Sequence, residues 1–316
     1  MINLELLKKK EKITVGIPQG LNYNRFSDLW ITYFEILGID LIISDDSTKK
    51  TLDEGTFYAT DDTCLSMKIF MGHVKNLVGR CDYIFVPRIA NFGLYEDMCT
   101  RYYALSDLVE NTFKDSGQKF LSLSIDVKDG IKEKEAFLDL GKQLGFPKVE
   151  ALRAYKLAKK ESDKKFEELK KNQKELFKKD GEKILIISHR YIIEDPYLGV
   201  PITKGLENLG AVPIIGSIVD RKLALRKSEE ISPTCKWIES RELLGSIEIY
   251  KDKIDGIVIV TAFPCNLDSM VNEIINRKVK DIPILNLVLD GQSGFAGVET
   301  RLESFLDIIR FKEGRL

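Results

Sequence analysis

The chain has 316 residues, of which 44% are hydrophobic and 31% are charged, and its formal net charge is −1. This length is enough for two domains of ordinary size, each with its own core. A charge near zero does not favour a nucleic-acid partner, and no apolar run approaches the roughly 20 residues that span a bilayer. The composition therefore predicts a soluble globular protein that binds neither nucleic acid nor membrane.

The N-terminal residues, Met1 to Glu5, lack the long apolar stretch of a secretory signal, and this predicts a cytoplasmic location. In that reducing compartment, disulfides are uncommon. The five cysteines are therefore expected to be free, metal-bound or catalytic.

Strand-like and helix-like patterns alternate in the first half of the chain. The apolar run 12–18 predicts a buried strand, and a helix follows in which Trp30, Phe34 and Leu37 recur at helical spacing. Strands that alternate with helices predict a mostly parallel sheet covered on both faces. Further strands are expected at 41–43, 82–87 and 120–123, and further helices at 66–77 and 100–113.

The stretch 149–179 has a different composition. It is rich in Lys and Glu and contains neither Gly nor Pro. Its apolar residues recur at a spacing that predicts one long amphipathic helix with a solvated face, ended by Asp180-Gly181. We expect this helix to bridge two domains.

The second half repeats the alternation. Strands are expected at 183–188, 211–215, 256–260 and 283–289, and helices at 201–209, 235–250, 267–277 and 298–310. The sequence thus predicts an α/β protein of two doubly wound, Rossmann-like domains with mostly parallel sheets. The predicted units are the domain 1–148, the linking charged helix 149–181 and the domain 182–316.

Familiar nucleotide and hydrolase motifs are missing from the sequence, which has no GxxxxGK[ST], no GxGxxG after the first strand and no GxSxG. The Gly-rich segment 291–297 lies between a strand and a helix, so its amides could meet an anion, although a plain connection is the simpler interpretation. Of the two histidines, His73 is expected to be packed or solvated inside a helix. His189 directly follows a strand and is the better site candidate.

Cys64, Cys99 and Cys265 each lie in a loop beside a predicted strand or helix. Thiolates gathered at strand ends suit a soft metal or an iron–sulfur cluster. The absence of a CxxC pair argues against a zinc ribbon or a thioredoxin motif. Inert buried cysteines are common, and we interpret Cys81 and Cys235 as structural. Spacing alone leaves both interpretations open for the other three.

Several segments resemble segments of the 2-hydroxyacyl-CoA dehydratase-related family, and they occur in the same order along the chain. Members of this family are also found fused to acyl-CoA dehydratase activases or encoded beside them. The three main similarities each contain or precede one of the three cysteines. They are residues 63–68 with 72–74 around Cys64, residues 82–88 with Cys99 downstream, and residues 254–269 around Cys265. Smaller similarities at 15–18, 189–201 and 300–305 extend the resemblance over nearly the whole chain.

The resemblance implies that Cys64, Cys99 and Cys265 bind one [4Fe–4S] cluster, with the fourth iron open to a substrate, water or another ligand. In the related dehydratases, an ATP-hydrolysing activator delivers one electron, which the cluster passes to a thioester carbonyl. Because this chain has no nucleotide motif, that activator would be a separate partner, and a homo- or heterodimer is also expected. The basic residues Lys68, Arg88 and Arg101 are expected to offset the thiolate charge.

The chain departs from the family pattern near two of the cysteines. Pro264 and Asn266 stand where the family tends to have glycines, and Thr100-Arg101 replaces the usual Pro-Lys after Cys99. Pro264 also removes an amide N–H that could bond a cluster sulfur. These changes keep the thiols but leave the substrate class open.

Three functions therefore remain open from the sequence. The first is an ATP-activator-dependent, low-potential dehydratase or reductase component that acts on a substrate such as an acyl-CoA thioester. The second is a non-enzymatic iron–sulfur scaffold or electron-relay subunit. The third is a cluster-free α/β ligand-binding protein whose cysteines are structural.

Overall fold

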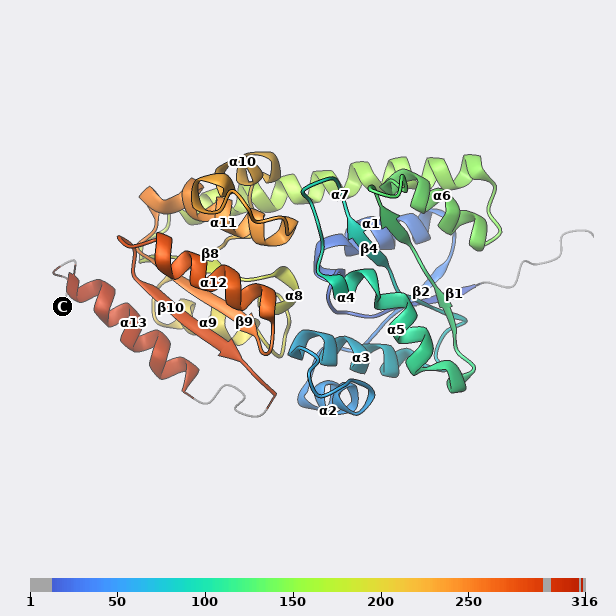
Figure 1. Ribbon diagram of the computed structural model, residues 1–316, viewed down its shortest axis with the longest axis horizontal. Helices are drawn as coiled ribbons and strands as arrows, with labels where there is room; N and C mark the ends of the chain where they lie inside the picture. Colours follow the sequence, from blue (N-terminus) through green and yellow to red (C-terminus); the bar gives the residue numbers. More distant parts are fainter. Residues whose placement is uncertain (1–12, 292–296, 313, 315–316) are drawn as a thin grey trace, which may run out of the picture.

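The chain folds around two parallel four-stranded sheets surrounded by helices, as the computed structural model shows for residues 13–291, 297–312 and 314 (Figure 1). Every pair of neighbouring strands within these sheets is parallel. The predicted class, α/β with Rossmann-like parallel sheets, is therefore confirmed. Most of the Gly-rich segment 291–297 lies outside the described residues, so the expectation of an anion site there is not addressed.

The first sheet has the strand order β2-β1-β3-β5. A third, smaller sheet continues from it, because β4 and β6 pair directly after β3 and β5. Pro87, which has no N–H to donate, separates β3 from β4. These strands are β1 (Thr14–Ile17), β2 (Asp40–Ile43), β3 (Tyr83–Phe85), β4 (Arg88–Asn91), β5 (Lys119–Leu121) and β6 (Ser124–Asp126).

The helices of the first half bury an aromatic core against this sheet. Trp30 and Phe34, predicted to share a helix face, both pack edge-on against Phe85 of β3, with ring centroids 5.1 and 5.3 Å apart. The prediction of one helix at 100–113 is wrong. Ala104 leaves the helical conformation (φ −94°, ψ 6°) and divides this stretch into two helices. The helices are α1 (Tyr23–Ile36), α2 (Lys49–Tyr58), α3 (Leu65–Leu77), α4 (Thr100–Tyr103), α5 (Leu105–Thr112) and α6 (Glu133–Gln143).

Two glycines let α2 and α3 touch backbone to backbone. A Cβ atom on Gly55 would lie 1.7 Å from the carbonyl oxygen of Lys68, and one on Gly72 would lie 2.0 Å from that of Thr51. No side chain larger than hydrogen fits at either position. This contact fixes α3, whose first turn begins directly after Cys64.

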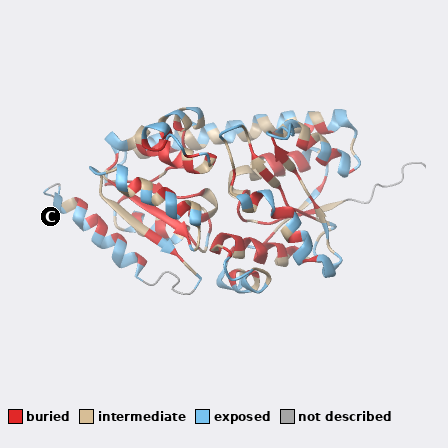
Figure 2. Cartoon of the chain, viewed as in Figure 1, coloured by how far each residue is buried: buried red, intermediate tan, exposed pale blue. Residues whose placement is uncertain are grey.

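The long charged helix α7 (Lys148–Leu176) forms close to the predicted range and spans both halves along one edge of the molecule (Figure 1). Near its middle, Lys165 pairs with Asp28 of α1 at 2.8 Å. Near its end, the Gln173 side chain bonds the backbone of Ile215 and Ile218 in the second half. Much of its surface is exposed, as predicted (Figure 2). The proposed domain limits at 148 and 181 stay a prediction.

The second sheet has the order β10-β9-β7-β8, with β9 buried along its whole length. Its strands are β7 (Lys183–Ile187), β8 (Val212–Ile215), β9 (Gly256–Ala262) and β10 (Ile284–Leu289). Its helices are α8 (Arg190–Ile193), α9 (Val200–Asn208), α10 (Arg221–Ile231), α11 (Ile238–Tyr250), α12 (Asn266–Lys278) and α13 (Val298–Lys312). Within the described ranges, no helix combines the length and the apolar character needed to cross a membrane.

Candidate functional site

The three cysteines singled out in the sequence line one pocket, where the first half of the chain meets the second. The pocket has about 540 Å³ of free space, including its opening to solvent. Each of the three cysteines is partly buried. The wall is made by Leu21, Cys64, Met67, Asp97, Met98, Cys99, Arg101, Tyr102, His189, Tyr191, Trp237, Glu239, Ser240, Cys265, Leu267 and Asp268.

Each of these cysteines is the residue that precedes the first turn of a helix. Cys64 caps α3, Cys99 caps α4 and Cys265 caps α12, all with non-helical backbone angles. None of the three side chains forms a capping hydrogen bond, but the backbone N–H groups of Met67, Arg101 and Asp268 in the following turn lower the thiol pKa. Unpaired amides at a helix start favour negative charge and so offset part of the effect of burial on these thiols.

Backbone hydrogen bonds between the halves hold these cysteine loops together. The N–H of Leu65, next to Cys64, donates to the carbonyl of Phe263, two residues before Cys265, at 2.9 Å. The loop before Cys99 is held in the same way, because Asp97 exchanges two backbone bonds with the 236–238 segment, each 2.9 Å long. The chain thus brings thiols from three distant segments to one place.

Burial keeps the thiols protonated in the absence of a bound group. It raises the pKa of Cys64 and Cys99, and it raises the pKa of Cys265 furthest. The Cys64 sulfur also raises the pKa of the other two thiols, which agrees with their proximity. Arg101 acts in the opposite direction on Cys64 and Cys99. A metal group that binds here must therefore displace protons.

A buried cation, His189, lines the same pocket as the thiols. Its Nε2 bonds Asp268 Oδ1 at 2.8 Å, its Nδ1 lies 3.6 Å from Glu239 Oε2, and its ring stacks on Tyr191. Burial alone would lower the pKa of His189, but the two carboxylates outweigh burial and raise it to about 9. The imidazole is therefore charged at neutral pH, and it faces the pocket as the sequence suggested.

The pocket wall holds three cysteine sulfurs, the usual ligands of iron–sulfur clusters. Across the part of the chain that the structure describes, no group of three or more His, Cys, Asp or Glu side chains is arranged to hold a metal ion. The assignment of Cys64, Cys99 and Cys265 as ligands of a [4Fe–4S] cluster stays a prediction.

Two of the three basic residues expected near the thiols lie elsewhere. Arg101 lines the pocket, as predicted. Lys68 instead donates to the carbonyl of Asp61 at 3.2 Å, and Arg88 lies over the ring of Tyr103, 4.2 Å from its centroid. Neither Lys68 nor Arg88 lines the pocket, and a contribution of their charges to the thiolates stays a prediction.

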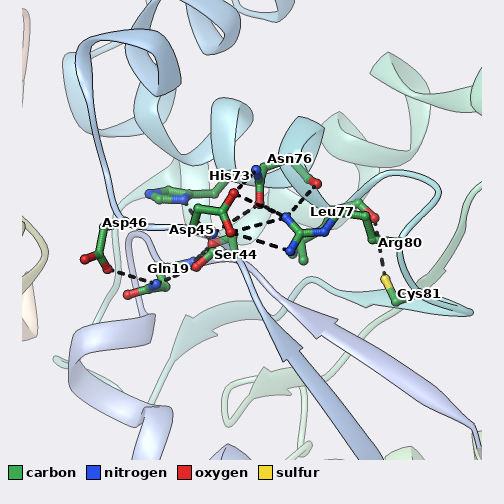
Figure 3. Close-up of polar contacts among 9 residues, drawn as sticks. All are labelled: Gln19, Ser44, Asp45, Asp46, His73, Asn76, Leu77, Arg80 and Cys81. Atoms are coloured by element: carbon green, nitrogen blue, oxygen red, sulfur yellow. Dashed lines mark hydrogen bonds and ion pairs between the residues drawn. The ribbon is translucent and has the colours of Figure 1, made fainter.

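The other two cysteines lie outside the pocket wall. The Cys81 thiol donates to the carbonyl of Leu77 at 3.7 Å (Figure 3). Cys235 is buried in the core of the second half, with 7% of its surface exposed. Both positions agree with a packing role.

His73 is buried in a hydrogen-bonded chain that also crosses between the halves. Ser47 donates to Asp195 Oδ2, so its oxygen accepts from the Nε2–H of His73 at 2.9 Å. The Nδ1 atom then accepts from Ser44 at 3.0 Å, and Ser44 accepts from the N–H of Gln19 (Figure 3). This chain is complete with a neutral imidazole, and burial lowers the pKa of His73 to about 4.

Sequence reasoning missed the acidic partners of His189. Asp268 comes three residues after Cys265, at a position where an α-helix turns its side chain back toward the capping residue. That spacing was a usable signal in the sequence. Glu239 and Tyr102 come from other elements, and only the tertiary structure places them here.

A comparison with solved structures finds a weak similarity to the SBP FpvC from Pseudomonas aeruginosa in complex with Mn²⁺. It is 11% identical, with a TM-score of 0.30, over 96% of this chain and 100% of that one. The same protein in complex with Ni²⁺ gives 12% identity and a TM-score of 0.29, over 96% and 98%. Likenesses this weak carry no weight for fold or function. No curated protein matches the chain.

A family match covers residues 14–219, more than half of the chain. The matched region includes Cys64, Cys99 and His189 but ends before Cys265. Its description supports the acyl-CoA activase side of the resemblance seen in the sequence. It mentions neither a 2-hydroxyacyl-CoA dehydratase component nor an iron–sulfur cluster. The chain belongs to the family described as the CoA enzyme activase uncharacterised domain (DUF2229).

Proposed function

We propose that the pocket binds a [4Fe–4S] cluster through Cys64, Cys99 and Cys265, and that the chain takes part in electron transfer to an acyl-CoA substrate. The observation that supports this proposal is that three thiols, each at the start of a helix, line one pocket. The family description supports the acyl-CoA context.

Two features of the pocket would offset part of the charge of bound thiolates. The starts of α3 and α12, each a helix of 13 residues, place backbone N–H groups near Cys64 and Cys265, where they lower the thiol pKa. Arg101 adds a cation beside Cys64 and Cys99, and charged His189 adds another in the pocket wall. When bound, the cluster would supply a one-electron carrier of low potential. The residues of this chain hold the thiolates, balance their charge and limit the access of water.

In this proposal, the partner protein of the chain is a separate ATP-hydrolysing activator, because this sequence has no nucleotide motif. The family description favours a second candidate, in which this chain belongs to the activator itself and passes the electron to a separate acyl-CoA dehydratase. Both candidates use the same cysteine pocket. They differ in which protein hydrolyses ATP and which binds the thioester.

The cluster is tested with protein purified and reconstituted under strict anaerobiosis. Bound iron, bound sulfide and visible absorbance are measured on the wild type and on Cys64→Ala, Cys99→Ala and Cys265→Ala. We expect about four irons per chain in the wild type and a marked loss in each of these variants. Cys81→Ala and Cys235→Ala are the matched controls and should keep the iron. A wild-type protein without iron and sulfide would reject the proposal and leave the cluster-free ligand-binding protein.

The two candidates are separated by two measurements on the loaded chain. In the first, the chain alone is incubated with ATP and released phosphate is measured, and sustained hydrolysis would favour the activator candidate. In the second, acetyl-CoA is added as a thioester probe to the dithionite-reduced protein. A change in the electron paramagnetic resonance (EPR) signal would place the thioester at this pocket. An unchanged EPR signal would indicate that the partner protein, and not this pocket, binds the thioester.

A further inference from the structure

Strand β10 lies at an edge of the second sheet and carries none of the usual protection against pairing with another chain. In the order β10-β9-β7-β8 it has β9 on one side, and no strand among the described residues pairs with its other side. The strand is six residues long, Ile284–Leu289, and contains neither a charged residue nor a proline. Edge strands of this length and apolar character readily accept a further strand.

The other edge strands of the two four-stranded sheets are protected. β2 begins with the charged residue Asp40, and β5 has only three residues, the first of which is Lys119. β8 contains Pro213, and the side chain of Gln173 in α7 bonds the backbone of Ile215 at the end of that strand. Charges, short length, proline and a covering side chain are devices that prevent pairing at an edge. β10 therefore differs from the other three edges.

The sequence of β10 reads almost the same in both directions about Asn286. Leu285 and Leu287 flank this residue, and Ile284 and Val288 come next on either side. An antiparallel pair of identical strands needs such a pattern, because a two-fold axis places each residue opposite its counterpart in the reversed strand. The pattern thus fits pairing of this strand with itself.

The backbone of β10 directs hydrogen-bonding groups to the open edge at every second residue. The carbonyl oxygens of Pro283 and Leu289 accept backbone hydrogen bonds of 2.9 and 2.8 Å on the β9 side. Because neighbouring residues of a strand direct their peptide groups to opposite sides, residues 284, 286 and 288 direct theirs away from β9. Arg301 of α13 agrees with this, since its guanidinium donates to the carbonyl oxygen of Asn286.

We infer that β10 pairs with β10 of a second copy of this chain, antiparallel and about a two-fold axis through Asn286, so that the two sheets join into one. Ile284 of one copy then lies opposite Val288 of the other, which is 54% exposed in the single chain. Such apolar cross-strand pairs stabilise a sheet. The N–H of Asn286 in each copy takes the carbonyl oxygen of Asn286 in the other, in place of Arg301.

Helix α13 widens the apolar surface beside this edge (Figure 1). Arg301 reaches the edge of β10, so the face of α13 that carries Arg301 lies next to it. Ile308 is two helical turns further along that face, and Phe311 follows one turn later. Their side chains are 53% and 73% exposed. A pair of strands alone is smaller than a stable interface, and these two residues supply further apolar contact.

The test is the mass of the full chain in solution, measured by sedimentation equilibrium over a range of concentrations. We expect the wild type to approach twice the monomer mass. Val288→Lys should raise the dissociation constant of the dimer by about tenfold or more, because each dimer then has two charges at the joined edge. Val149→Lys is the matched control, since Val149 is 79% exposed in α7, and it should dimerise as the wild type does.

Val288→Pro tests the backbone bonds separately from side-chain packing. It removes an N–H that is directed to the open edge, and edge strands tolerate proline, so the variant should fold and remain a monomer. Circular dichroism checks the folding of both Val288 variants. If Val288→Pro fails to fold, Val288→Lys and the cross-link described next decide the question.

The axis itself is tested with Asn286→Cys. In an antiparallel pair, the Cα atoms of two opposite hydrogen-bonded residues lie about 5.5 Å apart, which a disulfide can span. Mild oxidation should therefore link two chains of Asn286→Cys, whereas the wild type and Val149→Cys should stay unlinked. A wild type that sediments as a monomer at every concentration would overturn the inference, and so would a dimer that both Val288 variants leave unchanged. Neither result depends on bound iron, so the proposed function stands or falls separately.

Discussion

The backbone N–H of Leu65 donates a 2.9 Å hydrogen bond to the carbonyl oxygen of Phe263. Leu65 is the first residue of α3, and Phe263 directly follows β9, so the bond joins the two halves of the chain. Cys64 and Cys265 flank it. The relative position of these two thiols is therefore set by main-chain geometry, and a group bound to both would reinforce this junction.

Loading with iron and sulfide should raise the stability of the whole chain. A group that binds only the folded state stabilises it by about 2.7 kcal/mol at a hundredfold excess over its Kd. The melting temperature of the anaerobically loaded protein should exceed that of the iron-free protein, and chelation should reverse the gain. Cys265→Ala should show no gain, whereas Cys235→Ala should keep it. Equal melting temperatures with and without bound iron would contradict this expectation.

Gly72→Ala should destabilise the protein by about 3 kcal/mol, the upper part of the range for overpacking. The added methyl would meet the carbonyl of Thr51 at 2.0 Å and push α3 away from α2. Without that clash, alanine would stabilise a helix interior by roughly 0.5–1 kcal/mol, so the sign of the effect is informative. Urea unfolding measures the change. Gly93→Ala is the control, since its methyl meets only Glu96 at an ordinary 3.6 Å.

Arg25→Met should cost about 2–3 kcal/mol of unfolding free energy. Arg25 of α1 forms two hydrogen bonds, of 2.7 and 2.8 Å, with Glu242 of α11, whose side chain is 5% exposed. Removing Arg25 leaves a buried carboxylate poorly compensated. Arg221, 3.3 Å from the same carboxylate, limits the loss.

The double variant Arg25→Met/Glu242→Leu should be more stable than Arg25→Met alone, because it removes the uncompensated charge as well. Lys50→Ala is a control, since its pair with Glu54 is exposed and should contribute no more than about 0.5 kcal/mol. Denaturant unfolding of the set measures these differences. A double variant less stable than the single one would refute the charge argument.

His73 should make the protein lose stability in acid. Its folded pKa of about 4 lies below the value of about 6.5 expected in the unfolded chain, so the unfolded chain binds more protons between these limits. The stability that neutral His73 contributes is complete above pH 6.5 and is lost as pH falls toward 4. The shift corresponds to about 3 kcal/mol.

The His73→Gln variant isolates this effect. It lacks the titrating ring, so it should be less stable than wild type at pH 7, and the gap should narrow by about 3 kcal/mol on going to pH 4. Denaturant unfolding at several pH values measures the gap. A constant difference across the range would show that His73 does not set the acid sensitivity.

Much of the fold follows from periodicity in the sequence. The buried strands β1, β7 and β9 and the charged helix α7 lie close to their expected ranges, because continuous apolar runs and long amphipathic patterns are strong local signals. The helices α2, α6 and α10 were not expected. Their sequences are highly polar, and the faces they bury become visible only in the packed structure.

The site could be predicted only in part. The positions of Cys64, Cys99 and Cys265 beside strands and helices suggested one pocket, and the structure brings them there. The charge of His189 could not be foreseen, because it depends on Asp268 and Glu239, which reach it from α12 and α11. Local patterns locate residues on elements, whereas pairings between elements depend on tertiary packing.

The single helix α7 is about 44 Å long at the usual rise per residue of an α-helix, and it connects the two halves of the molecule without a break. Because it contacts Asp28 on one side and Ile215 and Ile218 on the other, this helix opposes separation of the two halves. A wider gap between the halves would require helix α7 to bend or one of these contacts to break. Entry to the thiols is therefore expected to proceed through rearrangement of individual side chains at the mouth.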